Sequence, residues 1–169
     1  LDICEAALAF AYTENDSVVP IVIGGDRSVG WPAFKAAFEH WEIKRKRRIG
    51  LLHFDAHTDL LESRLGVRYC FATWAYHANE LLGRDGRLVQ VGIRASGYPR
   101  RHWESELGVK QYWSKEASER SVHSLVSEIR AHFERLGVDA LYVSNDIDGT
   151  DPRFASATGT PEPNGLTPE

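Results

Sequence analysis

The stretch that decides the fold is Ile49-Gly50-Leu51-Leu52-His53-Phe54-Asp55-Ala56-His57-Thr58-Asp59. Its apolar first half, 49–54, has the length and composition of a buried strand, and polar side chains follow it at once. Polar residues also follow two further apolar runs. The run 18–23 is followed by Gly24-Gly25-Asp26, and the run 140–143 leads into Asp146 and Asp148. Another strand is predicted over 86–93. The sequence therefore predicts several buried strands, three of which end in acidic residues.

Helical patterns separate these strands. Apolar residues recur at helical spacing at the start of the chain and over 32–41, 69–82 and 121–136. Strands that alternate with helices, and that are apolar on both faces, predict an α/β fold in which helices cover both faces of a parallel sheet. Because ligands bind beyond the carboxyl ends of such strands, the three acidic clusters should converge in space.

Composition limits the class of protein. The 169 residues are 43% hydrophobic and 26% charged, which is typical of a folded chain, and we expect residues 1–169 to form a single domain. The net charge of −4 argues against a nucleic-acid partner and against binding to an anionic membrane surface. With only Cys4 and Cys70, and no apolar run of about 20 residues, the sequence predicts a cytoplasmic protein without a membrane span.

Two features predict that the domain is incomplete at both ends. The sequence contains no methionine, and a helical pattern is already under way at Ile3. At the other end, Thr167-Pro168-Glu169 has the order of an N-cap, a first-turn proline and a first-turn acid. We therefore expect this chain to be part of a longer protein.

The acidic clusters have the chemistry of a metal site. Residues two apart on an extended segment face the same side, so Asp55, His57 and Asp59 should point together. The same spacing relates Asp146 to Asp148. Several carboxylates in one crevice repel one another unless cations neutralise them. An oxygen-rich set with histidine suits Mn²⁺, while Zn²⁺, Fe²⁺, Co²⁺ and Ni²⁺ stay open, as does a structural use of each Asp to cap a helix or tighten a turn.

Three motifs, taken together, resemble those of the ureohydrolases, the family of arginase and agmatinase. They are Gly24-Gly25-Asp26, His53-Phe54-Asp55-Ala56-His57-Thr58-Asp59, and Ser144-Asn145-Asp146-Ile147-Asp148-Gly149-Thr150-Asp151-Pro152. A fourth segment, Ala157-Thr158-Gly159-Thr160-Pro161-Glu162-Pro163-Asn164-Gly165-Leu166, is closer to the agmatinase form than to the arginase form. The resemblance covers 18–167 and implies an arginase-like three-layer fold.

The resemblance implies a hydrolase with two Mn²⁺ ions. In that family, metal-activated hydroxide attacks the guanidinium carbon of a small guanidino substrate, here agmatine-like, and urea leaves. By motif position, Asp55 and Asp146 would bridge the metals and act in catalysis. His57 and Asp148 would complete the coordination of one metal ion, and Asp59 would help to hold the other ion. The family also implies a homo-oligomer of the full-length protein.

Two positions depart from the family pattern. Arg27 stands where the family has a metal-binding histidine, and a guanidinium cannot coordinate a cation. We expect Arg27 to pair with Asp26, Asp59 or another acid and to weaken one metal site. Phe71 stands where relatives have a histidine used in proton transfer or substrate contact, and His77 is a substitute only if its helix turns it inward.

These departures leave two alternatives to a binuclear hydrolase. One is a non-catalytic paralogue that keeps the fold after losing metal ligands, for which Arg27 and Phe71 are the distinguishing residues. The other is a mononuclear metal amidohydrolase that resembles the zinc deacetylases of related fold. The number of metal ions bound per chain separates the second alternative from the binuclear hydrolase.

Overall fold

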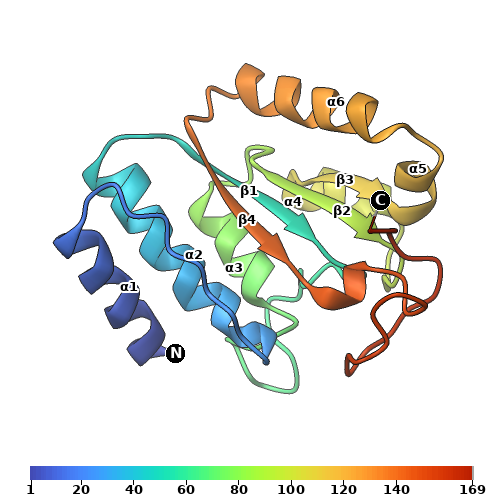
Figure 1. Ribbon diagram of the computed structural model, residues 1–169, viewed down its shortest axis with the longest axis horizontal. Coiled ribbons are helices and arrows are strands. Elements are labelled where there is room, and N and C mark those ends of the chain that lie inside the picture. The colour runs from blue at the N-terminus through green and yellow to red at the C-terminus, as the bar shows by residue number, and fades with distance from the viewer. Residues whose placement is uncertain (169) are drawn as a thin grey trace.

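The computed structural model describes residues 1–168, in which strands and helices alternate (Figure 1). In chain order the elements are α1 (Asp2–Glu14), α2 (Gly30–Phe38), β1 (Ile49–Phe54), α3 (Trp74–Leu81), β2 (Leu88–Ile93), α4 (Arg100–Leu107), β3 (Lys110–Trp113), α5 (Ser114–Ser118), α6 (Val122–Arg135) and β4 (Ala140–Asn145). Short 3-10 turns cover Arg27–Val29 and Ile147–Gly149, and a π-helical turn, Glu39–Lys44, continues α2. No helix in this described part is long and apolar enough to cross a membrane.

The strands form one parallel sheet in the order β3-β2-β1-β4. Leu51 of β1 lies opposite Leu88 of β2 on one side and Tyr142 of β4 on the other. Because the strands all run the same way, their carboxyl ends share one edge, where Asp55 follows β1 and Asp146 follows β4. The predicted α/β fold with a parallel sheet is confirmed.

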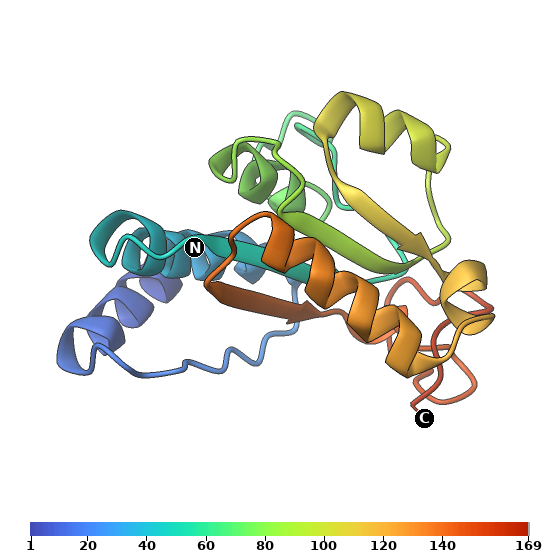
Figure 2. The ribbon, with the colours of Figure 1, turned by 90° about the horizontal axis from the view of Figure 1, so that it is seen from above.

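Helices cover both faces of this sheet, which gives three layers (Figures 1 and 2). On one face, α2, α3 and α4 bury a core that includes Phe34, Trp74 and Leu88. On the other face, α5 and α6 bury a second core that includes Val91 and Phe133. Burial of apolar side chains is the main stabilising contribution in such a fold. The two cores hold the sheet between them, so the loops at its carboxyl edge start from fixed positions.

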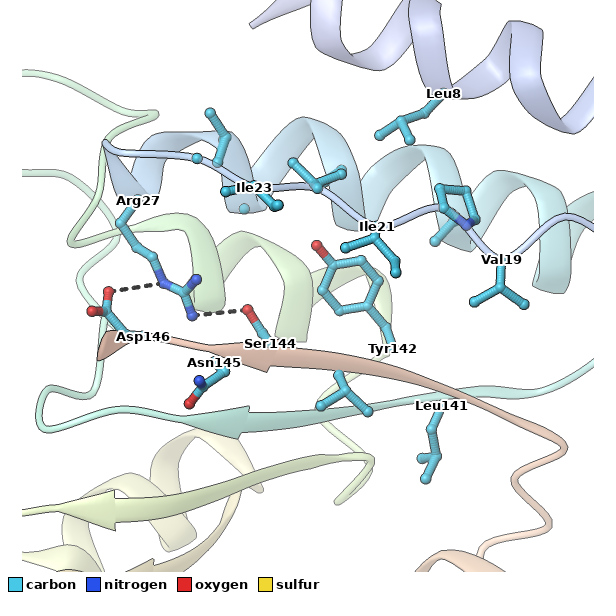
Figure 3. Close-up of a pocket in the computed structure, with 18 of the residues that line it drawn as sticks. Leu8, Val19, Ile21, Ile23, Arg27, Leu141, Tyr142, Ser144, Asn145 and Asp146 are labelled. Atoms are coloured by element: carbon cyan, nitrogen blue, oxygen red, sulfur yellow. Dashed lines mark hydrogen bonds and ion pairs between the residues drawn. The ribbon is translucent and has the colours of Figure 1, made fainter. Parts of the chain in front are cut away.

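The predicted strand over 18–23 is not part of the described sheet. The segment is extended but largely exposed, with Ile21 and Ile23 at 86% and 93% accessibility. It runs beside the edge strand β4 (Figure 2), and a cavity of about 570 Å³ lies between the two (Figure 3). β-Branched residues favour an extended backbone, but a strand forms only where a neighbour supplies hydrogen-bond partners. The prediction of an extended segment was therefore right, and the prediction of a buried strand was wrong.

Three elements between α3 and α6, namely α4, β3 and α5, do not follow from the sequence pattern. The strand β3 contains only 4 residues, and the helix α5 contains 5. Elements this short do not complete enough periods to show a clear pattern. The helix predicted over 69–82 begins later, at Trp74, because the hydroxyl of Thr73 closes the preceding turn by donating to the carbonyl oxygen of Arg68 at 2.8 Å.

Candidate functional site

A cavity of about 640 Å³ opens at the carboxyl edge of the sheet, where the loops after β1 and β4 meet. All the predicted metal-site residues line it, with both residues that depart from the family pattern: Asp55, His57, Asp59, Asp146, Asp148, Arg27 and Phe71. Asp55, His57 and Asp148 offer ligand atoms within 4.8 Å of one another. The ligand atoms of a second group, formed by His53, Asp55 and Asp59, also lie within 4.8 Å of one another. The fold thus brings together side chains that lie far apart in the sequence.

Asp55 is buried at the end of β1 and belongs to both groups. Its Oδ2 is 2.8 Å from Nε2 of His53, and its Oδ1 accepts a hydrogen bond from the backbone N–H of His57 at 2.6 Å. Burial alone would raise the pKa of Asp55, but hydrogen bonds from His53 and His57 outweigh it and hold the pKa below its ordinary value. Asp55 is therefore a buried anion around which the site is arranged.

His57 lies between two carboxylates. Its Nδ1 is 3.2 Å from Oδ2 of Asp148 and 3.5 Å from Oδ1 of Asp55. Hydrogen bonds to Asp148 and to Asp55 raise the pKa of His57 to about 10, so the ring of the metal-free protein is protonated at neutral pH. Asp148 is held in turn by Thr160, whose hydroxyl donates to its Oδ2 at 2.9 Å, and by the backbone N–H of Ala56 at 3.2 Å.

The group Asp55, His57 and Asp148 fits a divalent metal ion. It offers two carboxylates and one imidazole, the mixed oxygen and nitrogen set that Mn²⁺ and other first-row metals accept. The side chain of His57 is 29% exposed, so the cavity reaches it, whereas both carboxylates are almost fully buried. Binding would require the ring to give up its proton, which couples metal affinity to pH.

Asp59 is buried beside this group. The indole Nε1 of Trp74 donates a hydrogen bond to its Oδ2 at 2.8 Å. Burial, followed by repulsion from the charge of Asp55, raises the pKa of Asp59 well above its usual range. Its φ of 52° is uncommon for a residue other than glycine. Asp59 is therefore a buried, hydrogen-bonded acid whose ionisation is disfavoured and whose backbone conformation is unusual.

Asp146 lies opposite Arg27. The Nε of Arg27 is 3.1 Å from Oδ2 of Asp146 and 4.0 Å from Oδ2 of Asp55. Burial, followed by repulsion from neighbouring carboxylates, raises the pKa of Asp146 above its ordinary value. The prediction that Arg27 pairs with an acid is confirmed, and its partners are Asp146 and Asp55 rather than Asp26 or Asp59.

His77 lies outside the lining of this cavity. It is buried on α3, where its Nε2 is 2.9 Å from the carbonyl oxygen of Arg68 and its ring contacts Trp31 and Tyr69. Phe71, in contrast, lines the cavity. The position of His77 is that of a core histidine with a satisfied hydrogen bond, so its geometry does not support a role in catalysis.

Two further residues support the site and were missed in the sequence. Gln90 on β2 donates from Nε2 to the carbonyl oxygen of Thr58 at 2.7 Å and to Nδ1 of His53 at 3.0 Å, which leaves Nε2 of His53 as the donor to the carboxylate. Arg94 follows β2 and donates to the carbonyl oxygen of Asp148 at 2.6 Å. In the sequence, the signal for Gln90 was a polar residue inside an apolar strand. The signal for Arg94 was a charged residue directly after that strand.

The charge on His57 predicts that the stability of the metal-free protein depends on pH. Its folded pKa is about 10 against an ordinary value of 6.5, so the stabilisation is complete below pH 6.5 and is lost as the pH rises toward 10. The free energy of unfolding is measured in urea with a chelator present. Between about pH 7 and pH 9.5, we expect this free energy to fall by about 1–3 kcal/mol more in the wild type than in His57→Gln. His123→Gln, on the exposed part of α6, should keep the wild-type slope. Equal slopes for the wild type and His57→Gln would contradict this assignment.

Curated proteins similar to this chain match most of its length. The chain is 37% identical over 155 residues to the guanidinobutyrase of Pseudomonas aeruginosa, which covers 89% of this chain and 46% of that protein. It is also 37% identical over 155 residues to the mitochondrial agmatinase of Gallus gallus, with 89% and 43% covered. The chain thus spans about half the length of the curated relatives it matches.

Solved structures share the fold. The agmatine ureohydrolase of Thermoplasma volcanium has a TM-score of 0.79 at 30% identity, covering 98% of this chain and 51% of that chain. The proclavaminate amidino hydrolase of Streptomyces clavuligerus has a TM-score of 0.80 at 32% identity, covering 98% and 52%. The sequence profile described as the Arginase family matches residues 3–169. The chain therefore belongs to the arginase family, as its acidic motifs indicated.

Proposed function

We propose that this chain carries the metal-binding part of a hydrolase that cleaves a C–N bond of a small guanidino compound and releases urea. The observation that carries the proposal is the group Asp55, His57 and Asp148, whose ligand atoms lie within 4.8 Å of one another at the wall of a cavity. Membership of the arginase family supports this chemistry. The names of two similar proteins, guanidinobutyrase and agmatinase, support a guanidino substrate.

The proposed metal is Mn²⁺, held by Asp55, His57 and Asp148 with Asp59 and Asp146 as further acidic candidates. When bound, a divalent metal supplies the Lewis acidity that lowers the pKa of water. Asp55 and Asp146 are the proposed catalytic carboxylates, since both face the space that the Arg27 guanidinium now occupies. The buried Asp55 would stay ionised throughout, because two histidines donate hydrogen bonds to it.

The lining of the cavity suits a cationic guanidinium on a short apolar chain. Asp146 lines the cavity, and Glu162 adds a carboxylate beside it, with its Oε1 3.9 Å from Nε2 of His57. Carboxylates bind guanidinium groups through charge-assisted, often bidentate hydrogen bonds. Phe71 and Tyr98 line the same cavity and offer apolar contact. An agmatine-like substrate therefore matches the acidic and aromatic side chains that line the site.

Urea release by the purified, Mn²⁺-loaded full-length protein tests this proposal. Agmatine, 4-guanidinobutyrate and arginine serve as substrates, and we expect agmatine to react at least about tenfold faster than arginine, whose carboxylate an acidic cavity repels. The control is the same protein treated with a chelator, which should release no urea. A folded, metal-loaded protein that releases urea from none of the three would contradict the proposal. That result would favour the non-catalytic paralogue, which the contact between Arg27 and Asp55 already favours.

Location and assembly belong to the same proposal. A cytoplasmic setting agrees with Cys4 and Cys70 as free thiols. A homo-oligomer of the full-length protein follows from the family resemblance. The partner is a small guanidino or amidino compound, and the net charge of −4 argues against nucleic acid and anionic membranes.

A further inference from the structure

Contacts on three sides hold Arg27 inside the site, and Figure 3 shows two of them, to Asp146 and to Ser144. Its Nη2 donates a hydrogen bond to Oγ of Ser144 at 2.8 Å, and its Nε forms an ion pair with Asp146 at 3.1 Å. Its guanidinium carbon lies over the ring of Trp74, 5.0 Å from the ring centre. Since only 18% of its side chain is exposed, Arg27 is a fixed part of the site.

The turn that carries Arg27 is built to aim it inward. Oδ1 of Asp26 accepts a hydrogen bond from the backbone N–H of Ser28 at 2.7 Å and caps the 3-10 turn. Directly after the turn, a Cβ at Gly30 would lie 2.7 Å from the ring of Trp74, so the backbone packs closely on that ring. The cap and the close packing on Trp74 therefore fix the backbone that carries Arg27.

Asp55 presents its two carboxylate oxygens to different surroundings. Oδ2 faces Nε2 of His53 at 2.8 Å and Nε of Arg27 at 4.0 Å. Oδ1 faces the backbone N–H of His57 at 2.6 Å and its ring at 3.5 Å. The Oδ2 side thus has a permanent cation, because arginine stays protonated in proteins and cannot coordinate a metal. The neighbour on the Oδ1 side is an imidazole, the commonest metal ligand.

The hydrogen-bonding groups on the Oδ2 side are already in use. Nε2 of Gln90 bonds to Nδ1 of His53 at 3.0 Å, so both ring nitrogens of His53 have partners. Oδ2 of Asp59 accepts the indole N–H of Trp74 at 2.8 Å. A metal ion bound by His53 would have to displace one of the two partners of that ring inside the protein, and it would face the charge of Arg27.

We propose that Arg27 is a resident cation that takes the place of a second metal ion, so that the chain binds one divalent ion, through Asp55, His57 and Asp148. The inference rests on the metal-dependent function proposed above and narrows it. The two-metal centre implied by the family resemblance is replaced by one metal ion and one guanidinium. Asp146, paired with Arg27, then serves to hold the guanidinium and not to bind metal.

Metal stoichiometry tests this inference without any substrate. Purified protein is dialysed against Mn²⁺ at rising concentration, and the bound metal is measured by elemental analysis. We expect one Mn²⁺ per wild-type chain, with no second ion up to about a hundredfold excess over the first Kd. Arg27→His removes the permanent charge and supplies an imidazole, so it should bind two ions and show the electron paramagnetic resonance spectrum of a coupled manganese pair. Arg130→His, on the exposed side of α6, is the control and should bind one.

Several results would overturn the inference. A wild-type chain that binds two ions with similar affinity would overturn it, and so would a wild-type chain that binds no ion. A folded Arg27→His protein that binds only one ion would also overturn it. If Arg27→His does not fold, the wild-type stoichiometry still decides the question. A protein that binds one ion but releases no urea would count against the proposed function and leave this inference standing.

Discussion

Replacing Asp55 with asparagine is expected to weaken Mn²⁺ binding by more than about a hundredfold, since the loss of residues that merely support a ligand already costs up to about that much. Asp55 is the one residue common to both candidate groups among the described residues. An amide keeps the shape of the side chain but removes its charge and one acceptor oxygen. His57 and Arg27 would then lose the anion that lies between them. Isothermal titration of chelator-treated protein with Mn²⁺ measures the effect.

The matched control makes the same chemical change at the opposite end of the sheet. Asp139 precedes β4, and its Oδ2 accepts a hydrogen bond from the backbone N–H of Arg48 at 2.8 Å. Asp139→Asn should bind Mn²⁺ as the wild type does, because distant sites act independently. Binding by Asp55→Asn within about tenfold of the wild type, or 1.4 kcal/mol, would remove Asp55 from the metal centre.

Replacing Arg87 with methionine is expected to cost about 3–5 kcal/mol of stability, the usual penalty for removing one partner of a buried ion pair. Only 4% of Arg87 is exposed. Its guanidinium contacts Asp85 at 3.0 Å, Glu42 at 2.6 Å, and the carbonyl oxygens of Ile49 at 2.9 Å and Leu82 at 2.8 Å. Methionine fills similar space but removes the guanidinium from two carbonyl oxygens and leaves Asp85 and Glu42 with their remaining donors, among them Arg48 and the backbone N–H of Ile49.

Thermal and urea unfolding of the metal-free protein measure this effect, and a loss of this size corresponds to a fall in Tm of about 10 °C for a chain of this length. Arg130→Met is the matched control. That arginine is 78% exposed and pairs with Glu134 one helical turn away, so its loss should cost no more than about 0.5 kcal/mol. An Arg87→Met protein within about 1 kcal/mol of the wild type would show that the network around Arg87 contributes little.

The central strand and the edge where the site lies were predictable from sequence. The run 49–54 is apolar on both faces, and such a run folds as a strand covered on both sides, as β1 does. Asp55, His57 and Asp148 lie at the carboxyl edge because a parallel sheet places all its strand ends there. The pattern of apolar and acidic residues was sufficient for this much, since it depends only on local order along the chain.

The segment 18–23 shows where that reasoning ends. Like 49–54 it is an apolar run with an extended backbone, yet Ile21 and Ile23 are exposed and the segment faces β4 across a cavity. β-Propensity describes how a side chain fits a pleated surface, and it does not provide the neighbouring strand. Whether an extended segment joins a sheet depends on what lies beside it in space.

By itself, the sequence determined the alternation of strands and helices, the family, and the acidic residues that gather at one edge of the sheet. The tertiary structure alone decided how these residues are used: Arg27 pairs with Asp146, Asp59 is bonded to Trp74, and His77 is buried away from the cavity. The physical reason is that charge pairing, burial and hydrogen bonding depend on distances between residues remote in the chain. Local periodicity carries no information about those distances.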